Sequence, residues 1–330
     1  MGTVSRESKK VINRDYIKIL IDIARNSMVF IALIVLFVVF SFTLSNVGKG
    51  FASPDNLWNI IRQTSLIAIL SVGMSFALAA GQIDLSVGAV VAVTGLTSAL
   101  VLRGYGIIPA IFAGLSVGAA VGALNGILVA YVGMPAFLAT LGTMIAFQGV
   151  ARTMTELKSI PITNQTFIFI FGGGDFRKIP VLVIWMLLFL IIGHIMLRKM
   201  PFGRKVLAIG GNRKAALYSG INVKKTIFTV MVFSGLLAGL AGILWAGWYG
   251  GGRYTIGDGS ELSAIAASVL GGTSIMGGIA SILGAGAGAI MIGMINTALV
   301  MYGLDVYQQM IVRGVVIIIA VAATQRRKGI

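Results

Sequence analysis

The feature that most constrains this chain is a series of nine hydrophobic runs, each long enough to cross a lipid bilayer. A membrane-spanning helix needs roughly 17–25 predominantly apolar residues. Hydrophobic residues make up 57% of the sequence and charged residues only 11%, whereas soluble domains carry roughly 25% charged residues. We therefore predict a polytopic, all-α membrane protein with spans at about 28–45, 60–80, 86–102, 107–131, 135–152, 179–197, 226–249, 279–302 and 307–324.

The positive charges are concentrated in three segments that we place on one side of the membrane. Lysine and arginine accumulate in short cytoplasmic segments. They are frequent in residues 1–26, in the segment 198–225, which has eight cations and no acid, and in the tail 326–330. Orientation and anionic lipid headgroups, rather than nucleic acid, explain the net charge of +16. We predict a multi-pass protein of the cell (inner) membrane with a cytoplasmic N-terminal segment at 1–26, a transmembrane domain at 27–325 and a cytoplasmic tail at 326–330.

The number of crossings and an internal similarity both indicate two inverted halves. Nine crossings would leave the two basic termini on opposite sides, so we count the short apolar run Leu262–Gly272 as a tenth, short or broken, element. Residues 122–131 (GALNGILVAY) share Gly, Asn, Leu, Val and Tyr with residues 293–302 (GMINTALVMY). The two copies lie five crossings apart and would run in opposite directions, as in the inverted repeats of transporters. Chance similarity between glycine- and alanine-rich helices is the competing interpretation.

The basic segment 198–225 contains a pattern typical of a small docking helix. We expect a turn at Gly210–Gly211, an N-cap at Asn212, two helical turns over Arg213–Ser219 and a stop at Gly220. A solitary helix of this length is marginal in water, and Arg213 lies at its positive end, where the helix dipole disfavours a cation. A partner surface would explain both features. The alternative is a basic loop that only fixes the topology.

Two glycine-rich breaks and a few polar residues within the spans are candidates for a transport pathway. The first break, Gly81–Gly88, contains Gln82, Asp84 and Ser86, and the second covers 271–278. Asp84 or Ser86 would either cap the following helix or form part of a gate, since paired breaks in two halves indicate a pathway. The polar residues within spans either line a cavity or bond helix to helix: Asn125, Thr140, Thr143, Gln148 and Asn296.

Several function classes find no support in the sequence. There is no cysteine and a single histidine, so a metal site is not expected. No G-x-x-x-x-G-K-[ST] motif occurs, so ATP is not bound in the P-loop manner, and no pair of carboxylates has the spacing of a catalytic dyad. We predict no catalytic residue and no cofactor. Ion-coupled secondary transport stays as an alternative, although proton relays normally need carboxylates or histidines within spans.

The motifs together resemble the membrane-spanning permeases of bacterial ABC importers, in the ribose/galactose/xylose-type monosaccharide branch. The resemblance runs from about residue 50 to the C-terminus and rests on GQIDLSVG (81–88), PAFLATLGT (135–143), FG (202–203), AIGGN (208–212), AA (215–216), SGI (219–221) and ELSAIAASVLGGT (261–273). Two residues depart from the family pattern, because Gln82 and Ala280 stand where glycine is usual. Related branches carry autoinducers, nucleosides or other small polar solutes, so an importer for such a solute is an alternative.

The resemblance also implies an assembly. A transport subunit without its own ATPase site would pair with a second permease copy, two cytoplasmic ATP-binding subunits and an extracytoplasmic solute-binding protein. The family's fold is a ten-helix importer type with inverted halves. The segment Gly203–Ile221 would be the coupling helix seated in the ATPase, with these contributing residues: Gly203, Gly210, Gly211, Asn212, Arg213, Ala215, Ala216, Ser219 and Gly220.

Overall fold

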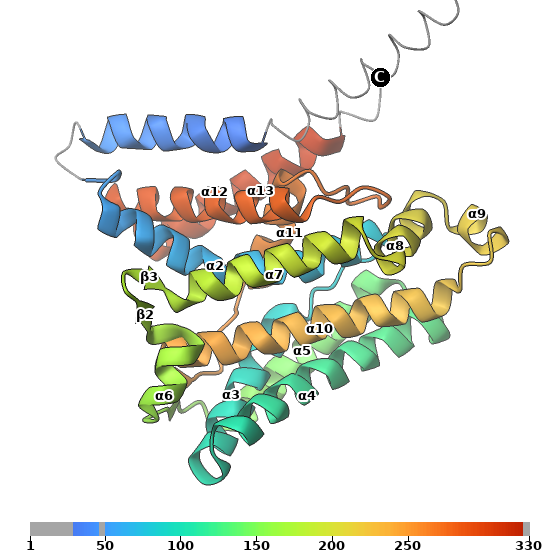
Figure 1. Ribbon diagram of the computed structural model, residues 1–330, viewed down its shortest axis with the longest axis horizontal. Helices are drawn as coiled ribbons and strands as arrows, with labels where there is room; N and C mark the ends of the chain where they lie inside the picture. Colours follow the sequence, from blue (N-terminus) through green and yellow to red (C-terminus); the bar gives the residue numbers. More distant parts are fainter. Residues whose placement is uncertain (1–28, 46–49, 326–330) are drawn as a thin grey trace, which may run out of the picture.

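A computed structural model describes residues 29–45 and 50–325 as a bundle of helices (Figure 1). The predicted basic segment 1–26 and the tail 326–330 lie outside these residues. The bundle begins with an unlabelled helix, Val29–Ser45. It continues with α2 (Pro54–Ala79), α3 (Val87–Tyr105), α4 (Ile107–Ile127) extended by the π-helical turn η1 (Leu128–Val132), α5 (Ala136–Thr153), α6 (Gln165–Ile168), η2 (Phe169–Gly173), α7 (Val181–Arg198), α8 (Pro201–Gly211), α9 (Arg213–Tyr218), α10 (Val223–Trp248), α11 (Ser260–Leu270), α12 (Ile282–Met301) and α13 (Val306–Gln325).

Each predicted hydrophobic run coincides with a helix, which confirms the all-α class. Within the described residues, six helices are long and apolar enough to cross a membrane, by length and composition alone: α2, α3, α4 with η1, α7, α10 and α12. Val29–Ser45 and α11 are shorter apolar helices. The chain is thus a multi-pass membrane protein, whereas ten crossings stay a prediction.

Helix α2 begins earlier than the predicted span because of its capping residues. The Ser53 hydroxyl accepts a hydrogen bond from the Asn56 backbone N–H, at 3.4 Å, and Pro54 occupies the first turn. Proline is favoured there because its missing N–H would have no helical partner anyway. The resulting helix of 26 residues lies at the centre of the bundle and contacts α7, α10, α11 and α12.

Glycines allow α4 and α10 to approach at backbone distance. A Cβ atom at Gly118 would lie 2.5 Å from the Gly235 carbonyl oxygen, and one at Gly122 would lie 2.6 Å from the Met231 carbonyl oxygen. The G-x-x-x-G spacing at 114, 118 and 122 is therefore a helix-packing feature. Gly118 faces Gly235, and Gly122, one turn later on α4, faces Met231, one turn earlier on α10. The two helices are therefore antiparallel.

The two segments of the proposed repeat run in opposite directions. Helix α2 is antiparallel to α10, since Gly73 contacts Ser234 while Gln63 shares a cavity with Trp245. It is also antiparallel to α12, since Val72 and Ile282 both face Gly193 and Thr64 faces Gly293. Helices α4 and α12 are therefore antiparallel. Residues 122–131 lie on α4 and η1, and residues 293–302 lie on α12 and its C-cap. This is the orientation that an inverted repeat requires, and the repeat itself stays a prediction.

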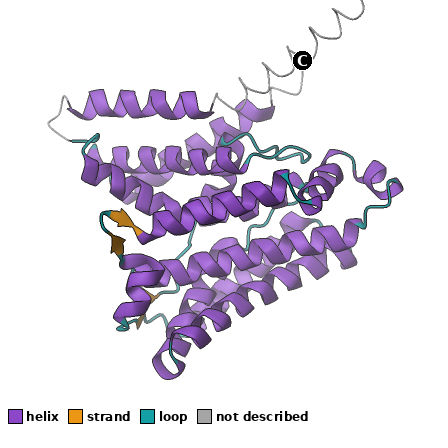
Figure 2. Cartoon of the chain, viewed as in Figure 1, coloured by secondary structure: helices purple, strands orange, loops and turns teal. Residues whose placement is uncertain are grey.

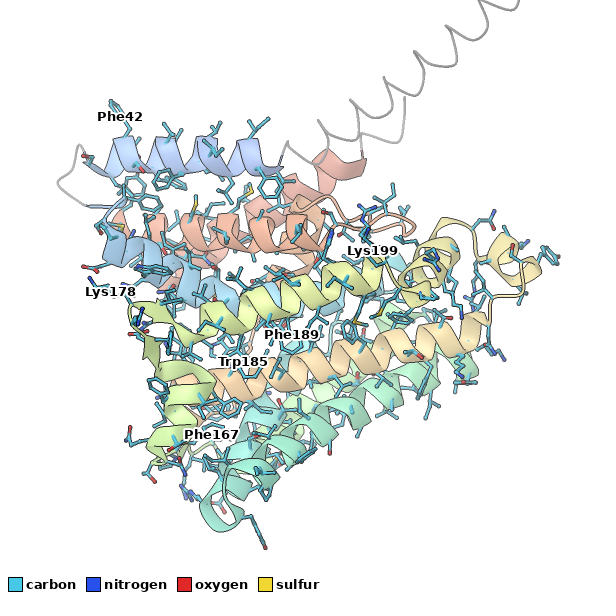
Figure 3. The ribbon with its side chains drawn as sticks, viewed as in Figure 1. Phe42, Phe167, Lys178, Trp185, Phe189 and Lys199 are labelled. Carbon is cyan, nitrogen blue, oxygen red and sulfur yellow. The ribbon has the colours of Figure 1, made fainter. Side chains whose placement is uncertain are left out.

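The two ends of the bundle differ in structure. Helices α8 and α9 project at one end, and α6 with the hairpin of β2 (Asp175–Phe176) and β3 (Ile179–Pro180) lies at the other (Figures 1 and 2). A second short ladder pairs β1 (Ile160–Pro161) with β4 (Gly251–Gly252). Figure 3 shows Lys178 and Lys199 at opposite ends of α7, where lysine side chains can reach an interface.

Much of the outer surface is apolar, as contact with lipid requires. Phe42 is 69% exposed and points away from the bundle in Figure 3. Helices α4 and α5 likewise expose large apolar side chains, including Phe112, Phe137 and Ile145. A soluble protein would not leave so many large apolar groups in water.

The α4–α10 contact gives a stability prediction. The change Gly118→Ala adds a methyl group against a carbonyl oxygen of the facing helix, so we expect a loss of about 1–3 kcal/mol, the usual cost of overpacking. Gly149→Ala on α5 is the control, because nothing lies within 4 Å of its Cβ position. Thermal unfolding in detergent measures both, and equal melting temperatures for the two variants would contradict the prediction.

Candidate functional site

Helix α8 carries the basic segment out of α7 and packs one face on the bundle. Pro201 starts the helix at its first turn, and three of its residues are buried: Gly203, Val206 and Ile209. Helix α8 was not predicted from the sequence, where a turn was expected at Gly210–Gly211. That placement was wrong, because both glycines are the last residues of α8. The apolar spacing of Val206 and Ile209 was a signal for this helix.

The predicted small helix is present as α9. The Asn212 side-chain oxygen accepts from the Ala215 backbone N–H at 3.0 Å, which confirms the predicted N-cap. Gly220 has a φ of +78°, and the Ile221 N–H donates to the Ala216 carbonyl at 3.1 Å, so the helix stops where predicted. The Ser219 hydroxyl donates to the Ala215 carbonyl at 2.9 Å.

Helix α9 presents almost all of its surface to solvent. Only Ala216 is buried, Leu217 is 60% exposed and Tyr218 is 88% exposed. The cations Arg213 and Lys214 are also exposed. A two-turn helix with an uncovered leucine and tyrosine has too little packing of its own to be stabilised by this chain alone.

The last residues of α8 meet the end of α2 and the second glycine-rich break. The Gly278 N–H donates to the Ala79 carbonyl at 2.9 Å and so joins the second break to the end of α2. A Cβ atom at Gly210 would collide with the Ala79 carbonyl and would lie 2.5 Å from the Gly278 nitrogen. Gly277, with a φ of +88°, lies against the Gly210 backbone. We call these four residues the backbone junction (Ala79, Gly210, Gly277 and Gly278).

A buried polar network holds the first break. The Asp84 carboxylate accepts from the Ser86 N–H at 3.0 Å, from the Ser86 hydroxyl at 2.6 Å and from the Ser234 hydroxyl at 2.7 Å. The Asn125 amide donates to the Ser86 oxygen at 2.8 Å and accepts from the Thr143 hydroxyl at 2.8 Å. All five side chains are buried, with at most 6% exposed. The network therefore ties the break to α4, α5 and α10.

Thr140 supports the same stretch through the backbone. Its hydroxyl oxygen accepts from the Leu85 N–H at 3.1 Å and lies 3.1 Å from the Ile83 carbonyl. Non-helical backbone at membrane depth is tolerated only when protein satisfies it. The interpretation of Ser86 as a side-chain cap was wrong, because Ser86 makes no such bond. Asp84 accepts at the start of α3 and also reaches α10, so capping accounts for only part of its contacts.

The second break has its own network of hydroxyl groups. The Ser75 hydroxyl donates to Ser268 at 3.2 Å, and the Thr273 hydroxyl donates to Ser75 at 3.4 Å. The Ser268 hydroxyl is also 3.1 Å from the Ser71 carbonyl, and the Ser281 N–H donates to Thr273 at 3.3 Å. Helix α2 thus holds the second break through Ser75, as α4, α5 and α10 hold the first.

The remaining predicted residues lie outside these networks. Gln82 is half-buried, and its amide donates to the Ala80 carbonyl at 3.2 Å. Gln148 is half-buried on α5, and no hydrogen bond between described residues joins it to the network. Asn296 lines a cavity toward the end of the bundle opposite α9. Ser234 was missed, because its partner Asp84 lies 150 residues away and no local pattern indicates the contact.

Comparison with known proteins identifies relatives of the whole chain. The family model described as "Branched-chain amino acid transport system / permease component" matches residues 56–321. The ribose import permease protein RbsC of Bacillus subtilis is 38% identical over 288 residues, 87% of this chain and 89% of that protein. RbsC of Haemophilus influenzae is 39% identical over 303 residues, 89% of this chain and 91% of that protein. The D-allose transport system permease protein AlsC of Escherichia coli is 37% identical over 274 residues, 82% of this chain and 84% of that protein. No solved structure matches the chain.

The matched region includes α8, α9, the backbone junction and both polar networks. These relatives confirm the resemblance that the motifs indicated. The chain belongs to the family of branched-chain amino acid transport system permease components.

Proposed function

We propose that this chain is the membrane-spanning permease subunit of an ATP-binding cassette importer for a monosaccharide. The observation that carries the proposal is the identity of 37–39% with proteins named as ribose and D-allose permeases. The similarity extends over more than four-fifths of each chain. The relatives do not favour the alternative of an ion-coupled secondary transporter. An importer for an autoinducer, a nucleoside or another small polar solute is less well supported, because RbsC and AlsC are both named for sugars.

Separate subunits would supply the energy. The absence of a P-loop motif from the sequence assigns ATP hydrolysis to cytoplasmic partners, which dock on α9 through Leu217, Tyr218 and the flanking cations. This docking places the segment 198–225 and both termini in the cytoplasm. A solute-binding protein then approaches the opposite end, and a second permease copy completes the passage.

Movement of α9 reaches the pathway through the backbone junction. Helices α8 and α9 are separated by Asn212 alone, so a shift of α9 moves the end of α8. Gly210 then displaces Ala79, which ends α2 just before the first break, and Gly278, which ends the second break. Packed backbone without intervening side chains has little room to absorb such a shift.

The hydrogen-bond network around Asp84 is the part of the pathway that responds to this movement and acts as its gate. Asp84, Ser86, Asn125, Thr140 and Thr143 hold the first break in one conformation, and Ser234 links it to α10. Because α10 follows directly after α9 and its loop, movement of α10 changes the hydrogen-bond partners of Asp84. Gln82 lies at the entry of the same break.

The docking surface can be tested with two exposed tyrosines. We expect Tyr218→Ala to weaken binding of the ATP-binding subunits by about 2 kcal/mol, roughly thirtyfold, as truncation of an interface tyrosine often does. Tyr105→Ala is the control, because Tyr105 is 77% exposed at the end of α3. Affinity is measured on purified subunits in detergent. Unchanged affinity of the Tyr218 variant would place the partner elsewhere.

The junction gives a second test, in which two adjacent glycines are compared. Gly210→Ala adds a methyl group between Ala79 and Gly278, so we expect sugar uptake to fall at least tenfold while the ATP-binding subunits still bind. Gly211→Ala adds the same group where nothing lies within 4 Å, and its effect should be much smaller. Uptake into proteoliposomes with the complete importer measures both. Equal uptake by the two variants would exclude transmission through Gly210.

The Asp84–Ser234 contact gives a third test. We expect Asp84→Asn to lower the free energy of unfolding by about 1–3 kcal/mol, because an amide nitrogen replaces an acceptor in a buried site. Combined with Ser234→Ala in a double-mutant cycle, the two changes should be non-additive by at least about 0.5 kcal/mol. Thermal unfolding of the four proteins provides the cycle, and additivity would show that the two side chains act independently.

A further inference from the structure

A cavity lies between α2, α10, α11 and α12, toward the end of the bundle opposite α9. Its volume is about 490 Å³, within the range of small-molecule sites. The aromatic residues Trp245, Trp248 and Tyr249 line it from the C-terminal end of α10. Helix α10 starts shortly after α9 and has 26 residues, so these rings lie roughly 35 Å along its axis from that start.

The lining combines flat aromatic groups with hydrogen-bonding side chains. Trp245 and Trp248 are half-buried. The side chains of Gln63 on α2, Asn296 on α12 and Asp258 in the loop before α11 supply amide and carboxylate groups. A cyclic sugar has an apolar C–H face that packs on an aromatic ring and hydroxyl groups that need donors and acceptors at its edge. A lipid chain would leave the polar groups without partners.

Several of these polar groups have no hydrogen bond within the described residues. The Trp245 indole nitrogen is buried and has no partner there. The amides of Gln63 and Asn296 make no hydrogen bond to another described residue either. By contrast, the Ser260 and Ser263 hydroxyls donate to the Gly257 and Gly259 carbonyls at 2.6 and 3.1 Å. The amides of Gln63 and Asn296 are therefore available to a ligand in the cavity, whereas the Trp245 N–H is shielded from it.

Asp258 adds an acceptor at the edge of the cavity. Partial burial raises the pKa of the Asp258 carboxyl above its usual value, and the charge of Arg152 opposes this shift. Within the described residues, no group of three or more histidine, cysteine, aspartate or glutamate side chains could hold a metal ion.

We propose that this cavity binds one monosaccharide during transport, with a ring packed on the tryptophans and hydroxyl groups bonded to Gln63, Asn296 and Asp258. The inference rests on the proposed function for the passage of a sugar. It adds that the permease chain itself selects the solute, at the end of the bundle where a binding protein would release it.

Matched amide variants test the site. Gln63→Ala and Asn296→Ala each remove one amide from the cavity. Gln165→Ala on α6 is the control, because Gln165 is exposed and is not among the residues that line the cavity. D-Ribose binding to the purified permease–ATPase complex, without the binding protein, is measured by saturation-transfer NMR titration. Melting temperatures show that each variant is folded.

We expect Gln63→Ala and Asn296→Ala to weaken D-ribose binding about three- to tenfold each, the usual effect of losing one hydrogen bond. Gln165→Ala should bind D-ribose as the unchanged protein does. D-Allose is tested in parallel, and weaker binding of either sugar by both cavity variants supports the site.

Equal affinities in all variants, or no saturable binding by a complex that imports sugar, would overturn the cavity site. Uptake of D-ribose and D-allose by the unchanged, complete importer is the separate test of the proposed function. If the complete importer takes up the sugars but the cavity variants bind D-ribose with unaltered affinity, the importer function stands and only the cavity site is excluded.

Discussion

The arrangement of this protein depends on how it satisfies two stretches of irregular backbone inside a helical bundle. A lipid bilayer offers no water to unpaired N–H and C=O groups, so such stretches persist only where protein supplies partners. The first break contacts an amide on α4 and hydroxyls on α5 and α10, and the second contacts the Ser75 hydroxyl on α2. The close α4–α10 packing through glycines keeps Asn125 and Ser234 near Asp84.

The same constraint explains why motion at the coupling end has specific consequences. Each break is held by neighbours rather than by its own helix, so it has few alternative sets of partners. A displacement at the backbone junction changes which groups face one another, and a buried group that loses its partner is costly. Two discrete arrangements are therefore favoured over a continuous range, which suits a passage open to one side at a time.

The sequence predicted the parts that depend on local patterns. Hydrophobic runs located the helices, and the Asn212 and Gly220 signals located α9 to within one residue of the bounds that the structure gives. Contacts between distant residues were not predictable. Arg62, for example, is paired with Asp175, 113 residues away. Helix α8 was missed because two adjacent glycines usually indicate a turn, while here one of them admits the Ala79 backbone.

Helix α2 connects the proposed sugar cavity to the coupling end. Gln63 and Thr64 line the cavity, Ser71 and Ser75 bond Ser268 on α11, and Ala79 accepts from Gly278 at the junction. A straight helix transmits a displacement along its axis with little loss, because its backbone hydrogen bonds resist stretching. A shift at Ala79 therefore changes the cavity wall about four turns away, since Thr64 and Ala79 are separated by 15 residues at roughly 1.5 Å each. The helix that forms the cavity wall is also the helix that the coupling element contacts, so solute release and ATP-driven movement share one rigid element.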